Sequence, residues 1–138
     1  MHTMTTPEDM RLVSLARELA GSFALREGGN AGSVSAALRT AKGKVYTGIC
    51  VDLPCGLGFC AEQAAVAAML KNRETVIDTL VAVRESGEIL APCGRCRELL
   101  LQIDIHNQQT RVLLPEDKCA KLSTLMPHAW RQVPTGSV

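Results

Sequence analysis

Segments with the apolar spacing of a β-strand alternate along this chain with segments that have the spacing of an α-helix, which limits the chain to folds that layer helices on a sheet. The first helical segment begins at Thr6, which can cap a helix, and Pro7 suits the first turn. Apolar side chains recur at helical spacing from Leu12 to Phe23. Gly-Gly-Asn at 28–30 is expected to end this helix.

Four later segments are expected to be strands. Residues 34–38 and 45–51 show the alternation of half-buried strands, and the polar turn at 41–44 between them predicts a β-hairpin. Residues 76–83 are rich in β-branched side chains, and 111–114 form another short apolar run. The sheet therefore has at least four strands.

Two more helices are expected between these strands. Residues 64–70 are good helix formers, and Pro92 opens a third helix over 93–103. The chain from Pro115 onward is expected to be irregular or partly helical. With 138 residues, the sequence predicts a single α/β domain.

Composition excludes several classes of protein. The formal net charge is +1 and only 3% of residues are aromatic, so a polynucleotide or membrane-surface binder is not expected. The longest helical apolar run, 64–70, is far too short to span a membrane, and the first residues do not resemble an export signal. We therefore expect a cytoplasmic protein, in which six cysteines serve metal binding or catalysis rather than disulfides.

Three cysteines and a glutamate form the pattern that carries chemistry. Cys60 and Glu62 stand at the start of the second helix, and Cys93 and Cys96 stand three residues apart at the start of the third. The free N–H groups and partial positive charge of a helix N-terminus favour a thiolate over a thiol. Three thiolates at two helix starts can converge on one metal ion, for which Zn²⁺ fits best.

Three protein ligands leave one position of a tetrahedral zinc ion open, which is typical of a catalytic site. Such an ion lowers the pKa of a bound water to about 7. Glu62 lies two residues after Cys60, where a carboxylate can carry protons to and from that water. The residues alone predict a catalytic zinc site with Glu62 as its proton shuttle.

Other uses of these residues stay open at this point. Cys93 and Cys96 could form a thioredoxin-like redox pair. Cys55 or Cys119 could supply a fourth sulfur, which would close the site and make the zinc structural. Glu62 could be a solvated acid at a helix start. The chain would then be a catalytically silent, zinc-stabilised binding module.

Cys-Ala-Glu at 60–62 followed by Pro-Cys-Gly-Arg-Cys at 92–96 resembles the zinc motif of the cytidine deaminase family, most of all its blasticidin S deaminase branch. The resemblance extends to Ser-Ala-Ala-Leu at 35–38, Thr-Gly at 47–48 and Leu-Met-Pro-His-Ala-Trp at 125–130. These segments stand in the family's order and cover nearly the whole chain.

The resemblance implies a three-layer α/β/α sandwich with a mixed sheet of about five strands. It would be one cytidine deaminase-like domain over residues 1–138, with 135–138 frayed. The resemblance also implies a homotetramer, with a homodimer as the alternative. The expected partner is a small nucleoside substrate, with no polynucleotide and no membrane.

The resemblance further implies a reaction. Cys60, Cys93 and Cys96 would bind Zn²⁺, and Glu62 would take a proton from the water that attacks C4 of a cytosine ring. Glu62 would then protonate N3 and the departing amino group, so that ammonia leaves. The expected substrate is a free cytosine nucleoside or a related aminopyrimidine; the alternative is a modified nucleoside such as blasticidin S, or another ring amine.

The resemblance implies some substrate contacts, and at other positions this chain differs from the family's pattern. The backbone at Ala61 is expected to contact the base, and Trp130 to stack on a substrate, including one held by a neighbouring subunit. Where the family holds the ribose with Asn and Glu, this chain has Cys50 and Asp52, which strand alternation puts on one face. Gly32 stands where the family has a substrate-packing Phe. These changes weigh against ordinary cytidine as the preferred substrate.

Zinc with three thiolates carries about one net negative charge, which opposes the formation of hydroxide. Many relatives have an Arg directly after the Glu, where this chain has Gln63. We expect Arg95 or Arg97 to donate to the cysteine sulfurs instead, aided by the helix dipoles.

Overall fold

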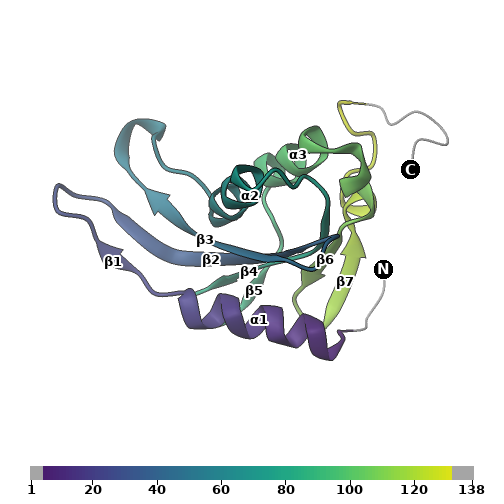
Figure 1. The fold of residues 1–138 in the computed structure, drawn as a ribbon. Coiled ribbons are helices and arrows are strands. Elements are labelled where there is room, and N and C mark those ends of the chain that lie inside the picture. The colour runs from purple at the N-terminus through teal and green to yellow at the C-terminus, as the bar shows by residue number, and fades with distance from the viewer. Residues whose placement is uncertain (1–4, 132–138) are drawn as a thin grey trace.

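Seven strands form one mixed sheet with helices on both faces in the computed structural model, which describes residues 5–131 (Figure 1). The strands are β1 (Phe23–Ala24), β2 (Asn30–Thr40), β3 (Val45–Asp52), β4 (Ile77–Arg84), β5 (Ile89–Leu90), β6 (Arg111–Leu114) and β7 (Lys118–Lys121). Helix α1 (Pro7–Leu19) covers one face, and helices α2 (Ala61–Lys71) and α3 (Gly94–Ile103) cover the other. Short 3-10 segments occupy Pro54–Gly56, Ile105–Gln109 and Leu122–Leu125. The predicted three-layer sandwich is confirmed.

Strand β4 lies at the centre of the sheet, because it pairs antiparallel with β2 and parallel with β6. The predicted hairpin of β2 and β3 is confirmed on one side, and β7 pairs antiparallel with β6 on the other. A parallel pair needs a crossover connection, and helix α3 supplies it. The crossover lies on the same face of the sheet as α2 (Figure 1).

The sheet contains more strands than the expected five or so. Five of them have four or more residues, whereas β1 and β5 have two each. The prediction of irregular chain after Pro115 is wrong for Lys118–Lys121, which form β7. This segment has little apolar character of its own, and it becomes a strand by pairing with β6 after a tight turn. Glu116 and Asp117 make that turn with φ values of 64° and 57°.

Helix α1 begins as predicted and ends earlier than predicted. Thr6 caps it, but the helix stops at Leu19, and Phe23 belongs to strand β1. The backbone leaves the helix because the N–H of Gly21 donates to the carbonyl oxygen of Gly32 at 2.8 Å, which draws the chain toward β2. The helical spacing of apolar residues therefore continues past the true end of the helix. The expected fraying of residues 135–138 lies outside the described residues.

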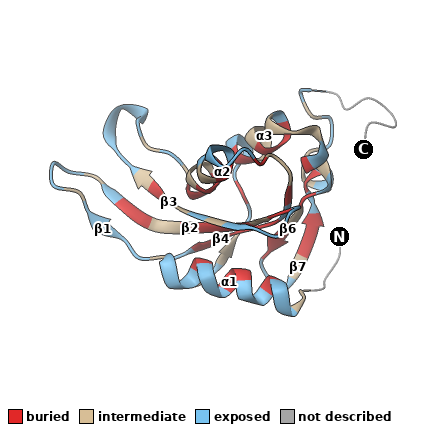
Figure 2. Cartoon of the chain, viewed as in Figure 1, coloured by how far each residue is buried: buried red, intermediate tan, exposed pale blue. Residues whose placement is uncertain are grey.

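The core has two parts, one on each face of the sheet. Strand β4 is buried on both faces, which explains its nearly continuous apolar sequence (Figure 2). Fully buried side chains between the sheet and helices α2 and α3 include Leu38, Met69, Leu80, Leu100 and Val112. Those between the sheet and α1 include Leu12, Val13, Ala37, Val81 and Leu113. No helix within residues 5–131 has the length and apolar character that crossing a membrane would require.

Helix α2 lies directly on strand β3 because Gly48 has no side chain. A Cβ atom at Gly48 would lie 2.4 Å from the backbone nitrogen of Ala65 and 2.7 Å from the carbonyl oxygen of Ala61. Both distances are shorter than van der Waals contact allows. The close approach sets the position of the N-terminal end of α2 relative to the sheet.

An ion pair joins the start of α1 to β6. Both Nη atoms of Arg111 donate to the carboxylate of Asp9, at 2.8 and 2.7 Å, and Asp9 is fully buried. Asp9 also accepts from the backbone N–H of Thr6 at 2.8 Å, which completes a capping box. Burial acts to raise the pKa of Asp9, but the bonds from Arg111 and Thr6 outweigh it and lower the pKa below its ordinary value.

Replacing Asp9 with asparagine is expected to destabilise the fold by about 3 kcal/mol at neutral pH, because the Arg111 charge loses its partner. Since folding lowers the pKa of Asp9, its ionised form stabilises the protein above about pH 4, and this contribution disappears as the pH falls through the folded-state pKa. Denaturant unfolding at several pH values measures both effects. Glu8→Gln removes an adjacent exposed carboxylate and is the matched control. Equal stability of the two variants at neutral pH would contradict the assignment.

Candidate metal centre

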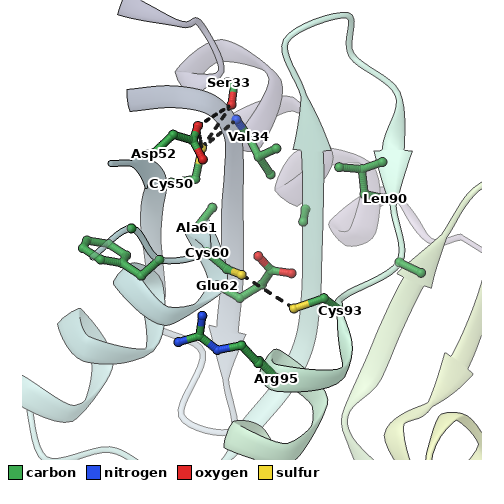
Figure 3. Close-up of a pocket in the computed structure, with 14 residues that line it drawn as sticks. Ser33, Val34, Cys50, Asp52, Cys60, Ala61, Glu62, Leu90, Cys93 and Arg95 are labelled. Atoms are coloured by element: carbon green, nitrogen blue, oxygen red, sulfur yellow. Dashed lines mark hydrogen bonds between the residues drawn. The ribbon is translucent and has the colours of Figure 1, made fainter. Parts of the chain in front are cut away.

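A pocket of about 370 Å³ opens beside the N-terminal ends of α2 and α3 (Figure 3). Strands β2, β3 and β4 form one wall, and the starts of the two helices form another. The lining residues are Ser33, Val34, Cys50, Asp52, Gly58, Phe59, Cys60, Ala61, Glu62, Ala82, Leu90, Ala91, Cys93 and Arg95. Most residues predicted for the site are therefore gathered around one cavity.

Two helix starts bring the three predicted cysteines together. Cys60 is the N-cap of α2, and the bridge between Phe59 and Val51 ties the preceding residues to β3. Cys93 is the N-cap of α3, and Cys96 lies in its first turn. The sulfur of Cys93 is 3.6 Å from those of both Cys60 and Cys96, and all three sulfurs lie within 4.8 Å of one another.

This spacing fits a tetrahedral zinc ion. Zinc–sulfur bonds of about 2.3 Å at tetrahedral angles put the sulfurs about 3.8 Å apart. The cluster of possible metal ligands found among residues 5–131 includes neither Cys55 nor Cys119. Cys55 is exposed, and the sulfur of Cys119 accepts from Arg111 at 3.7 Å, away from the pocket. A closed site with four cysteines is thus not formed in this part of the chain.

The protonation of the three thiols departs from the expectation for helix starts. Burial acts to raise the pKa of Cys93, but backbone N–H groups at the start of α3 and bonds from the neighbouring thiols lower it below its ordinary value. Burial and the neighbouring Cys93 raise the pKa of Cys60. Burial and the charge of Glu62 raise the pKa of Cys96. Hydrogen bonding in this cluster therefore favours the thiolate at Cys93 alone, and a divalent cation is the group that would stabilise all three thiolates.

Glu62 lies in the first turn of α2 and is 5% exposed, so it is not a solvated helix-start acid. Its carboxylate points into the pocket beside the sulfurs of Cys60 and Cys93 (Figure 3). Burial raises the pKa of Glu62 above its ordinary value, and backbone N–H bonding offsets part of that rise. A carboxyl group with a raised pKa can accept and return a proton near neutral pH.

The structure places three of the four predicted substrate contacts at the pocket, leaves one outside it, and adds a residue that was not predicted. Cys50, Asp52 and Ala61 all line the pocket. Trp130 does not line it; its side chain lies on the surface near the start of α3 and is 76% exposed. Ser33 was missed by the sequence analysis, although its hydroxyl lies 3.2 Å from the sulfur of Cys50. Its polar side chain beside a predicted strand was the available signal.

The two candidate arginines differ in position. Arg95 lines the pocket, on the side of Cys60 and Cys93 and away from Asp52 (Figure 3). Arg97 instead donates to two backbone carbonyl oxygens, those of Pro92 at 2.8 Å and Leu125 at 3.0 Å. The hydrogen bonds of Arg97 therefore anchor the start of α3 to the C-terminal segment, and they do not reach the sulfurs.

A family model described as the cytidine and deoxycytidylate deaminase zinc-binding region matches residues 7–111 of this chain. The blasticidin-S deaminase of Bacillus cereus is 31% identical over 102 residues, which cover 67% of this chain and 71% of that protein. The cytidine deaminase of Mycobacterium tuberculosis is 33% identical over 99 residues, which cover 71% of this chain and 72% of that protein.

Solved structures resemble the whole described fold. A crystal structure of cytidine deaminase from Mycobacterium tuberculosis superposes with a TM-score of 0.76 and 30% identity, covering 93% of this chain and all of that one (100%). A cytidine deaminase from Burkholderia pseudomallei gives a TM-score of 0.69 and 28% identity, covering 92% of this chain and 100% of that one.

Proposed function

Because the chain belongs to the cytidine and deoxycytidylate deaminase family, we propose that it is a zinc-dependent enzyme that hydrolyses the amino group from the cytosine ring of a free nucleoside. The reaction consumes one water and releases ammonia and the corresponding uracil nucleoside. The observation that carries this proposal is the grouping of three sulfurs within 4.8 Å of one another, beside a pocket that Cys60, Cys93 and the buried carboxylate of Glu62 line. A closed structural site and a silent binding module are disfavoured by that arrangement.

Cys60, Cys93 and Cys96 would hold the zinc ion. When bound, zinc polarises the attacking water and stabilises negative charge at the reacting centre. Glu62 accepts a proton from that water as its oxygen bonds to C4 of the ring. Glu62 passes this first proton to N3. It then carries the second proton of the water, from the new hydroxyl on C4, to the amino group, whose bond to C4 breaks as ammonia leaves. The raised pKa of Glu62 suits a group that must both take and return a proton.

The other lining residues suit a flat, neutral ring. Val34, Ala82 and Leu90 supply an apolar wall, and the backbone at Ala61 is close enough to the cavity to contact the base. Arg95 is the one basic side chain among the lining residues, and it lies on the side away from Asp52. A phosphate on the sugar would therefore approach a carboxylate, which favours a nucleoside over a nucleotide or polynucleotide.

An ammonia-release screen with zinc-loaded protein tests the function. The panel contains cytidine, deoxycytidine, deoxycytidylate, blasticidin S, other aminopyrimidines and purine nucleosides. We expect turnover of cytidine or deoxycytidine, with deoxycytidylate a poor substrate. Turnover confined to purine nucleosides, or none on any cytosine ring, would exclude the proposal.

We propose that Arg95 compensates the negative charge of the zinc–thiolate group. Removing a cation raises the pKa of nearby acids, so Arg95→Gln should move the acidic limb of the pH profile of kcat/KM about 1 unit toward higher pH. It should also make the protein lose zinc to a chelator more readily. Arg97→Gln is the matched control, because the Arg97 guanidinium is engaged with two carbonyl oxygens. An unshifted acidic limb in the Arg95 variant would discard this role.

We propose a homotetramer, with a homodimer as the alternative, working in a reducing compartment such as the cytoplasm. Large apolar side chains are exposed around the pocket, with Leu57 70% and Phe59 40% exposed. The free cysteines need reducing conditions to stay available to zinc. Trp130 lies outside this chain's own pocket, so any stacking on substrate would be in a neighbouring subunit. Light scattering of the purified protein tests the assembly.

A further inference from the structure

Strand β2 contains a bulge at the edge of the pocket. Ala31 pairs with Val51 and Ser35 pairs with Ile49, so residues 32–34 stand opposite a single residue of β3. Gly32 in this bulge has a φ of +88°, and a Cβ atom there would lie 2.3 Å from the carbonyl oxygen of Gly21. Only glycine fits this position. The bulge therefore has a defined shape, and it brings Ser33 to the pocket.

Hydrogen bonds connect this bulge to β3. The backbone N–H of Val34 donates to the sulfur of Cys50 at 3.3 Å, and the hydroxyl of Ser33 lies 3.2 Å from the same sulfur. The Ser33 hydroxyl also donates to Oδ2 of Asp52 at 3.4 Å. Cys50 is 6% exposed, and these bonds to its sulfur hold the bulge in place. The hydroxyl of Ser33 orients the carboxylate of Asp52.

The carboxylate of Asp52 keeps free capacity to accept hydrogen bonds. Its side-chain bonds within residues 5–131, from Ser33 and Cys50, both go to Oδ2. No residue of that range donates a side-chain bond to Oδ1. Asp52 itself is exposed at the pocket. A ligand with hydroxyl groups can therefore be recognised at this end.

The cluster lies where the sugar of a nucleoside would extend. Figure 3 shows Ser33, Cys50 and Asp52 at one end of the pocket, with Glu62, Cys60 and Cys93 further along it. A cytosine ring held at Glu62 would lie along the apolar wall between the two groups. Its N1 substituent could then reach the Asp52 carboxylate.

We propose that Ser33 is a specificity-determining residue, which acts by holding the Asp52 carboxylate ready to accept hydrogen bonds from the sugar hydroxyls. This inference rests on the proposed function. Ser33 is a positioning residue, because it acts through Asp52. Ser33 and Asp52 together would recognise the sugar. The sulfur of Cys50 instead accepts a hydrogen bond from the backbone N–H of Val34 in β2.

Ser33→Ala is expected to raise the KM for cytidine about tenfold with little change in kcat, since it removes the donor that orients a charged acceptor. A ligand without a sugar separates this effect from general damage to the pocket. The inhibition constant of 1-methylcytosine against cytidine turnover should stay unchanged. Ser33→Thr keeps the hydroxyl and should retain most of the affinity for cytidine. Ser123→Ala, at an exposed serine outside the pocket, is the matched control.

A double variant tests whether Ser33 acts through Asp52. If it does, Ser33→Ala should have little further effect on KM once Asp52→Ala is present. Additive losses, equal weakening of cytidine and 1-methylcytosine, or an unchanged KM for cytidine would each overturn the inference alone. Failure of the unmodified zinc-loaded protein to deaminate cytidine or deoxycytidine would overturn this inference, and failure on every cytosine ring would overturn the proposed function as well.

Discussion

Replacing Glu62 with alanine is expected to lower kcat by about 10²- to 10⁴-fold, because the variant has no group to carry protons between water and the ring. Zinc content and the circular dichroism spectrum should match those of the unmodified protein. Steady-state ammonia release, with zinc measured on the same samples, provides the test. Turnover near the unmodified rate in a folded, zinc-loaded variant would end the proposed mechanism.

Glu62→Gln tests whether Glu62 is needed for proton transfer or only to fill its space in the pocket. Glutamine fills the same space beside the sulfurs but cannot exchange the proton, so this variant should be as inactive as the alanine variant. Folding raises the pKa of Glu62, and so the ionised carboxylate weakens the metal-free fold at pH values above its ordinary pKa. Metal-free Glu62→Gln should therefore unfold at no lower temperature than the unmodified protein. Glu98→Gln, on α3 and outside the pocket, is the matched control.

Removing any one of the three clustered sulfurs is expected to abolish both zinc binding and turnover. Cys60→Ala, Cys93→Ala and Cys96→Ala should each reduce bound zinc from about one ion per chain to a small fraction, since two thiolates hold the ion far less tightly than three. Metal analysis after dialysis against a mild chelator, with ammonia release on the same samples, measures both losses.

Two other cysteines provide controls for the zinc experiment. Cys55 and Cys119 lie outside the ligand cluster, so Cys55→Ala and Cys119→Ala should each retain zinc. X-ray absorption of the loaded protein should detect three sulfurs and one lighter atom around the metal. Four sulfurs, or full zinc retention after loss of a clustered cysteine, would contradict the open catalytic site.

The residues of the candidate zinc site could be named from the sequence because their spacing is a local property. Cys93 and Cys96 stand three apart at a helix start, which puts their sulfurs on one turn whatever the rest of the chain does. Cys60 and Glu62 share the start of another helix in the same way. The hairpin of β2 and β3 was predictable for a similar reason, since alternation and a turn lie within one short segment.

Features that depend on contacts between distant segments were missed or left undecided. Helix α1 ends at Leu19 because the following residues hydrogen-bond to β2. Residues 118–121 form strand β7 because they pair with β6. Arg95 and Arg97 could not be separated, because two residues on one helical turn differ only in what surrounds them. The carbonyl oxygen of Leu125, 28 residues away, engages Arg97 and leaves Arg95 at the pocket.

The amino-acid order was therefore enough to name the candidate zinc ligands, the candidate proton carrier and the layered fold, since each follows from periods and spacings of a few residues. The convergence of Cys60 with Cys93 needed the packing of α2 on Gly48 and the crossover through α3. The approach of Ser33 to Asp52 likewise needed the bulge in β2. Such contacts arise from long-range packing and strand register, which no local pattern encodes.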